Sequence, residues 1–250
     1  MKHLKEFATT AQYEAYTADT ENFILPNVSI CNDNPTAVHY HPYDPYEYVD
    51  LGLSVKWAKW NVGATKEEEY GLYFQWGDTQ GYTAEQVTGS STPHKDFSWA
   101  DYKYSNNGGS TATAMTKYNS SDGKTVLEAS DDAATVNMGG SWRMPTEAEF
   151  NELINTANTT SAWTTVNGVS GVKFTSKKSG YTDKYVFFPA AGNCDNGSLL
   201  SKGSDGYVWS STLYSSNVIS GRNLYFDNGY RRMSNLDRCY GYSVRGVFGG

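Results

Sequence analysis

Short runs of alternating apolar and polar residues, separated by turn-forming residues, constrain the fold of this 250-residue chain more than any other feature. In residues 49–57, apolar side chains occupy every second position, which is the period of a half-buried strand. Asp195-Asn196-Gly197, Asp205-Gly206 and Asp227-Asn228-Gly229 predict tight turns between later strands. The other expected strands are residues 71–76, 172–175, 185–188, 207–210, 223–226 and 243–248.

Helical signals are few. Thr146 and Glu149 have the spacing of a capping box, and apolar residues from Phe150 to Ala157 then fall on one helical face. A shorter helix is expected over residues 130–136, with Asp131 and Asp132 stabilising its N-terminal end. This adjacent pair also resembles catalytic carboxylates, but neighbours on a helix do not face each other, which favours capping. Two short helices and a small, mostly antiparallel sheet indicate the α+β class.

The chain divides at about residue 46. Residues 1–46 combine a short helical pattern near residues 10–18 with a run rich in Pro, Asn and Tyr, whose residues 42–46 should be extended. We expect an N-terminal arm or attachment segment there and one globular domain over residues 47–250. His39 and His41 lie in the arm without thiolates or carboxylates that would complete a metal shell, so we expect solvated side chains. Residues 78–125 are rich in Gly, Ser, Thr and Asn and predict long surface loops.

Charge and cysteine usage exclude several classes of protein. A net charge of −7 argues against a sequence-independent nucleic-acid binder, although five of the six arginines fall in the last 41 residues and weakly favour a polar or anionic partner. Cys31, Cys194 and Cys239 are odd in number and widely spaced, so they predict free thiols. No apolar run is long enough for a membrane span, and residues 1–10 lack an apolar core, so we expect cytoplasmic synthesis without a signal peptide.

The C-terminal segment has an unusual composition. Lys, Glu, Gln and Trp, common in the first 209 residues, are absent from residues 210–250. Tyr, Ser, Asn, Asp and Arg fill the segment instead, and these are residue types of antibody-like contact surfaces. The composition therefore predicts a recognition surface.

Four phrases in this order connect the chain to a known group of domains: GGSWRMPT at residues 139–146, FPAAG at 188–192, GYVWSS at 206–211 and SVRGV at 243–247. They resemble the C-type-lectin-like domains of bacterial surface proteins, formylglycine-generating-enzyme-like domains and the variable proteins of diversity-generating retroelements, a group that includes phage tropism determinants. The resemblance covers residues 48 to the C-terminus. It implies a C-type-lectin-like fold preceded by the arm.

Among these families the retroelement variable proteins match best. Their variable region is rewritten at template adenines, and randomised AAY codons cannot yield Lys, Glu, Gln, Trp or Met. The resemblance implies a variable region at about residues 199–247 on a fixed framework of Trp142, Arg143, Pro145, Trp209, Arg222 and Arg245. The diversified, ligand-binding positions that it implies are Leu213, Tyr214, Val218, Ile219, Tyr225, Asp227, Tyr230, Arg232, Ser234, Leu236, Asp237, Cys239, Tyr240 and Tyr242.

The implied function is binding rather than catalysis, with no catalytic residue, no metal and no cofactor. The partner would be a host-surface protein or glycan receptor, and the protein would act in host attachment from a phage tail in the virion. A homotrimer stays open, as does a bacterial cell-surface or adhesion module of the same fold. A formylglycine-generating-like enzyme is the third alternative, and it requires two cysteines within disulfide reach in one cleft.

Overall fold

The computed structural model describes residues 6–7, 28–31, 34–40, 46–89 and 91–249. The chain forms two compact units, residues 1–45 and 46–250. The first contains an antiparallel sheet of order β1-β3-β2, built from β1 (Glu6–Phe7), β2 (Val28–Cys31) and β3 (Asn34–Tyr40). His39 lies in β3, whereas His41, the expected helix near residues 10–18 and the extended residues 42–45 lie outside the described residues.

The second unit is built on two sheets. The four-stranded sheet has the order β4-β5-β17-β7 and the five-stranded sheet the order β15-β14-β13-β16-β6. Within the five-stranded sheet, β13 and β16 run parallel and the other neighbours run antiparallel. The strands of these sheets are β4 (Tyr48–Val49), β5 (Lys56–Asn61), β6 (Tyr73–Phe74), β7 (Trp142–Arg143), β13 (Gly206–Leu213), β14 (Ser220–Phe226), β15 (Arg231–Asp237), β16 (Tyr242–Ser243) and β17 (Arg245–Phe248).

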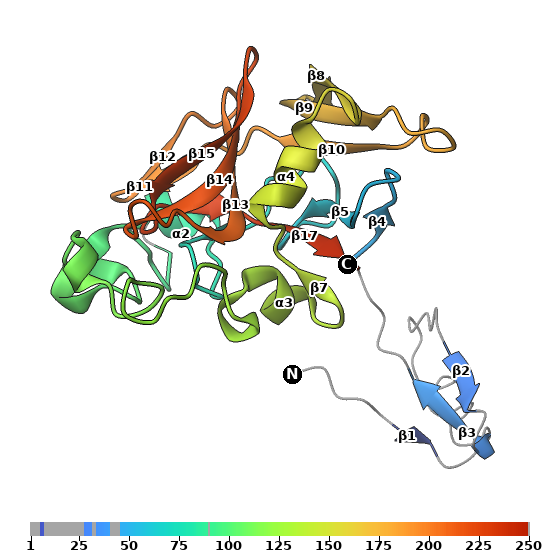
Figure 1. The fold of residues 1–250 in the computed structure, drawn as a ribbon, viewed down its shortest axis with the longest axis horizontal. Coiled ribbons are helices and arrows are strands. Elements are labelled where there is room, and N and C mark those ends of the chain that lie inside the picture. The colour runs from blue at the N-terminus through green and yellow to red at the C-terminus, as the bar shows by residue number, and fades with distance from the viewer. Residues whose placement is uncertain (1–5, 8–27, 32–33, 41–45, 90, 250) are drawn as a thin grey trace. The chain divides into compact units, whose positions relative to one another are not determined.

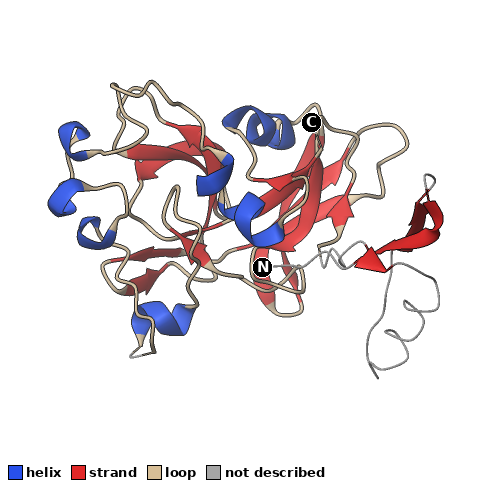
Figure 2. Ribbon diagram, turned by 90° about the horizontal axis from the view of Figure 1, so that it is seen from below, coloured by secondary structure: helices blue, strands red, loops and turns tan. Residues whose placement is uncertain are grey.

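Two smaller sheets and several short helices complete this unit, so the α+β class is confirmed. Figure 2 shows short helical turns interspersed with strands and long loops. The smaller sheets comprise β8 (Thr159–Val166), β9 (Val169–Ser176) and β10 (Tyr185–Pro189), and β11 (Asn193–Asp195) with β12 (Ser198–Leu200). The helices are α2 (Ala84–Thr88), α3 (Ala133–Met138), α4 (Glu147–Ile154) and the 3-10 turns η1 (Trp99–Asp101), η2 (Asn106–Gly108), η3 (Ala112–Ala114) and η4 (Ala129–Asp131).

Helix α4 begins as its sequence predicts. The Thr146 side chain accepts the amide of Glu149 at 3.3 Å, and the Glu149 carboxylate accepts the amide of Thr146 at 2.7 Å, which completes the capping box. Phe150 and Leu153 are buried. The helix ends at Ile154, so Ala157 is exposed beyond it and the apolar pattern overestimated its length.

The two aspartates before α3 have different roles. Asp132 is the N-cap and accepts the amide of Thr135 at 2.8 Å, as expected. Asp131 does not cap the helix, which corrects the sequence interpretation. Its buried carboxylate accepts the Tyr118 hydroxyl at 2.6 Å and pairs with Lys103 and Lys117.

Three sequence expectations about strands and loops were wrong. Residues 49–57 form two strands, because Gly52, at φ +68°, takes part in a reversal that pairs Val49 with Trp57. Residues 243–248 divide between the two main sheets, with Ser243 in β16 and Arg245 in β17. The expected surface loops at 78–125 contain α2 and three 3-10 turns and bury Val87, Phe97, Tyr102, Tyr104, Met115 and Tyr118.

The hydrophobic core lies on both faces of β13 and β14. On one face Leu224 and Phe226 pack in the same cluster as Trp57 and as Phe150 of α4, and Figure 1 shows α4 across this part of the sheet. On the other face Trp209 packs with Trp76, Trp142 and Tyr242 in a second cluster. Two buried layers thus hold β13 and β14, and the other predicted binding residues lie in β15, in β16 and in the connections between these strands.

Candidate ligand-binding surface

The candidate site is the part of the five-stranded sheet that the second core cluster leaves incompletely covered. Side chains alternate between the faces of a strand. The register pairs Tyr207 with Tyr225 and Tyr225 with Arg232, so these three side chains lie in line across β13, β14 and β15. The next line on the same face is Trp209, Asn223 and Ser234.

Four tyrosines form a continuous row on this face, which we call the tyrosine row: Tyr240, Tyr242, Tyr207 and Tyr225. Successive ring centroids are 6.2, 5.0 and 5.1 Å apart, and the Arg232 guanidinium lies 5.4 Å from the Tyr225 centroid. Tyr242 is buried, whereas the other three rings are half-buried. The row therefore joins the core to a surface of polarisable rings on rigid strands.

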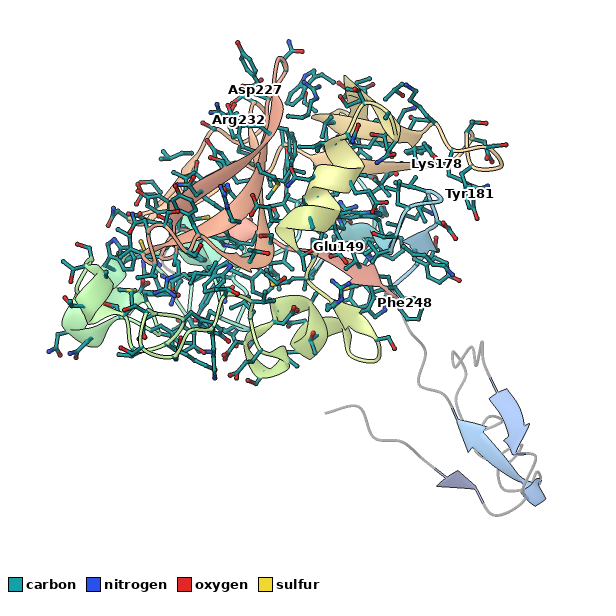
Figure 3. All side chains as sticks on the ribbon, viewed as in Figure 1. Glu149, Lys178, Tyr181, Asp227, Arg232 and Phe248 are labelled. Carbon is teal, nitrogen blue, oxygen red and sulfur yellow. The ribbon has the colours of Figure 1, made fainter. Side chains whose placement is uncertain are left out.

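Most of the fourteen predicted binding residues are accessible, but they do not form one compact patch. Tyr225, Arg232, Ser234 and Leu236 share the face of the row. Asp227 and Tyr230 lie in the β14–β15 connection, and Figure 3 labels Asp227 and Arg232 near its end. The remaining accessible members are Tyr214, Val218 and Ile219 in the β13–β14 connection, with Asp237 and Tyr240 beside the end of β15.

Three predicted binding residues are core residues, and this corrects the sequence prediction. Leu213, Cys239 and Tyr242 have exposed fractions of 4%, 2% and 0%. All three belong to the second core cluster. That randomised AAY codons can encode a residue type does not determine which way its side chain points. The compositional argument therefore could not separate these three residues from accessible neighbours.

Hydrogen bonds and burial set the electrostatics of the row. The Tyr225 hydroxyl donates to Asp227 Oδ2 at 2.7 Å, which lowers the pKa of the Asp227 carboxyl. Burial raises the pKa of Tyr207, and the carboxylates of Asp205 and Asp227 raise it further. Burial likewise raises the pKa of Tyr240, with added contributions from Asp195 and Asp237. The rings are thus neutral phenols surrounded by carboxylates.

Two buried polar side chains at the row, Asn223 and Tyr242, have no hydrogen-bond partner among the described residues. Both side-chain polar atoms of Asn223, which is 0% exposed, are unpartnered. The hydroxyl of Tyr242 is in the same state. Leaving such a group unpaired costs about 1–3 kcal/mol, and native proteins keep few of them. The floor of the surface therefore has unused hydrogen-bonding capacity.

Sequence reasoning missed several members of this surface. Tyr207 and Asn223 were predicted only as strand residues, and Asp195 and Asp205 only as turn residues. The alternation rule could have found the first two. Tyr207 lies two positions before Trp209, and Asn223 two before Tyr225, so each shares a face with its neighbour.

The tail arginines do not form a basic surface. Arg238 and Arg245 are 0% exposed, and Arg222 pairs with Glu147 at 3.1 Å. Arg245 donates to Asn61 Oδ1 and to the carbonyls of Ala58 and Phe187, each at 2.9 Å, and so ties β17 to β5 and β10. Three of the five tail arginines therefore bind within the domain, whereas Arg232 is exposed, and the polar or anionic partner stays a prediction of the tail composition.

Cys194 and Cys239 are free and buried. They lie in different core clusters, and burial raises the pKa of both thiols. A reactive cysteine requires the opposite shift, because the thiolate is the nucleophile. The environment thus gives neither thiol the activation that the formylglycine-type alternative requires.

The described part of the chain has neither a metal-ligating cluster nor a helix suited to cross a membrane. No group of three or more His, Cys, Asp or Glu side chains there could hold a metal ion. None of the helices described has both the length and the apolar character that a bilayer crossing requires.

Comparison with known proteins gave no match: no protein-family model, no curated protein and no solved structure is similar to the chain.

Proposed function

We propose that residues 46–250 form a ligand-binding domain that displays variable side chains on a rigid, C-type-lectin-like scaffold. The tyrosine row is the observation that supports this proposal. Tyrosine combines a large amphipathic contact area with a low loss of rotamer entropy, and it is enriched among residues that dominate binding energy. The neighbouring Arg232, Ser234 and Asp227 supply adaptable polar contacts.

The architecture suits a surface whose side chains change. Trp209, beneath the row, donates its indole N–H to the Phe74 carbonyl at 2.8 Å, and Trp76 donates to the Ser210 carbonyl at 2.8 Å. These bonds link β13 to neighbouring segments without using the exposed positions. Substitutions at Tyr230 or Arg232 should therefore leave the sheet intact.

We propose the biological role that the sequence resemblance implies. The protein would recognise a host receptor from a phage tail, and a retroelement would diversify its C-terminal segment. The partner would be a protein or glycan on the host surface. The absence of Lys, Glu, Gln and Trp from residues 210–250 supports this role. It predicts a reverse-transcriptase gene and a near-identical template repeat, with AAY codons at the variable positions, beside the gene.

A display experiment tests the binding function. A library randomised with AAY-derived codons at Tyr214, Tyr230, Arg232 and Tyr240 should yield mostly protease-resistant proteins and, after selection on purified proteins and glycans, saturable binders. The matched control library randomises the buried Leu213, Cys239 and Tyr242 and should be mostly unfolded. Equal loss of folding in both libraries, or no binder from the first, would contradict the proposal.

A further inference from the structure

Four carboxylates lie around the tyrosine row without a salt-bridge partner in the described part of the chain. Asp195, Asp205, Asp227 and Asp237 all lie close enough to raise the pKa of tyrosines in the row. Among the described residues, none of these four forms an ion pair. Arg232 is the single arginine in contact with a ring of the row.

The most defined part of this acidic surface surrounds Tyr240. Cys194 and Gly241 exchange two backbone hydrogen bonds of 2.8 and 2.9 Å, so the next residues outward, Asp195 and Tyr240, are neighbours. The Tyr240 amide donates to the Asp237 carbonyl at 3.1 Å, which brings the end of β15 to the same place. The half-buried carboxylates of Asp195 and Asp237 thus lie close to the half-buried Tyr240 ring.

The two carboxylates repel each other electrostatically. Burial raises the pKa of Asp237 and the charge of Asp195 adds to the increase, whereas the nearby Trp99 side chain, within hydrogen-bonding reach, lowers it. Like charges held together in a partly desolvated place are stabilised by a cation. No described lysine or arginine forms an ion pair with either carboxylate.

The buried hydroxyl of Tyr242 points to the same ligand chemistry. It has no hydrogen-bond partner among the described residues, and its ring lies 5.0 Å from the Tyr207 ring and 6.2 Å from the Tyr240 ring, within the row. A phenol oxygen can accept a hydrogen bond from an ammonium or guanidinium group. The Arg232 guanidinium over Tyr225 shows that a ring of this row accepts a cation against its face.

We propose that the tyrosine row binds a basic segment of a partner protein, with an arginine or lysine side chain seated against Tyr240 between Asp195 and Asp237. This inference rests on the proposed binding function and specifies its partner. Carboxylates and aromatic faces together favour a cation over an anionic glycan, and the burial of Arg238 and Arg245 removes two cations that an anion would need.

Peptide titration followed by NMR tests the proposal on the full chain. The probe is an acetylated, amidated peptide of alternating glycine and arginine, and its matched control has neutral citrulline in place of arginine. The arginine peptide should give saturable shifts of the amides of Asp195, Tyr240 and Gly241. The citrulline peptide should bind roughly fivefold more weakly, because a charged contact in a partly exposed site contributes about 1 kcal/mol.

Two charge-matched variants separate a local site from general attraction to an acidic protein. Asp195→Asn with Asp237→Asn should weaken binding roughly tenfold. Asp183→Asn with Glu68→Gln removes the same charge from side chains that bond to Lys184 and Asn167, and should change binding by less than about twofold. Thermal melting verifies that both variants fold.

Three results would overturn the proposal: equal weakening in both double variants, equal binding of both peptides, or no saturable shift at the three amides. An anionic probe, polyglutamate, that binds there instead would have the same effect. The two proposals can be distinguished. If binders selected from the display library do not depend on Asp195 and Asp237, the surface is a binding site as proposed, but it does not bind a cation.

Discussion

Tyr242 offers a sharp test, because its ring and its hydroxyl should have opposite effects on stability. The ring is fully buried, 4.2 Å from the Trp209 centroid and 5.0 Å from that of Tyr207. Truncating a buried aromatic side chain costs about 3–5 kcal/mol, so Tyr242→Ala should lower the free energy of unfolding by that amount. The hydroxyl has no hydrogen-bond partner in the described ranges of the chain. Tyr242→Phe should therefore leave stability unchanged or raise it by about 1 kcal/mol.

Urea unfolding followed by tryptophan fluorescence measures these differences, and Tyr230→Ala is the control. Tyr230 is 68% exposed, so its truncation should change the free energy of unfolding by less than about 0.5 kcal/mol. The dependence on urea should be the same in all variants if only stability has changed. A loss above about 1 kcal/mol in Tyr242→Phe would show that the hydroxyl has a partner. A loss below about 1 kcal/mol in Tyr242→Ala would show that the ring is not part of the core.

Three further predictions concern the scaffold. Arg245→Met should destabilise the protein by about 3 kcal/mol or more in urea unfolding, because the carbonyls of Ala58 and Phe187 lose their donor. Hydrogen bonds from Lys117 and neighbouring groups hold the pKa of the Asp131 carboxyl well below its usual range despite burial, so its stabilisation is complete above about pH 5 and declines as the pH falls further. The stability difference between the wild type and Asp131→Asn should thus shrink between pH 5 and 3. Thr146→Ala should cost about 1 kcal/mol in thermal unfolding through loss of the α4 cap, whereas Thr146→Ser should restore it.

Local signals in the sequence predicted the elements whose causes are local. The capping box of α4 needs only Thr146 and Glu149, and the β11–β12 turn needs only Asn196 and Gly197, which adopt φ values of +45° and +72°. Strand β15 was missed because its residues, Arg231–Asp237, lack apolar alternation. The strand exists because β14 offers a ladder of hydrogen-bonding partners to seven residues.

The candidate site shows the same division. Composition identified the segment that contains most of the surface, because residue types that suit recognition were concentrated there. Composition could not separate Tyr240, which is half-buried at the surface, from Tyr242, which lies two positions later and is buried against the rings of Tyr207 and Trp209. It also gave no reason to join Asp195 to Tyr240, since their proximity comes from backbone bonds between distant segments.

The sequence by itself determined the α+β class, the presence of α3, the capped start of α4, the turns at residues 196–197 and 227–229, and the location of the tyrosine-rich segment. These follow from dihedral preferences, capping and side-chain periodicity, which act over a few residues. Only the tertiary structure decided which tyrosines are accessible, which aspartates lack a cation, and that residues 78–125 contribute to the core. Burial and charge compensation depend on segments far apart in the chain, and no local pattern encodes where those segments meet.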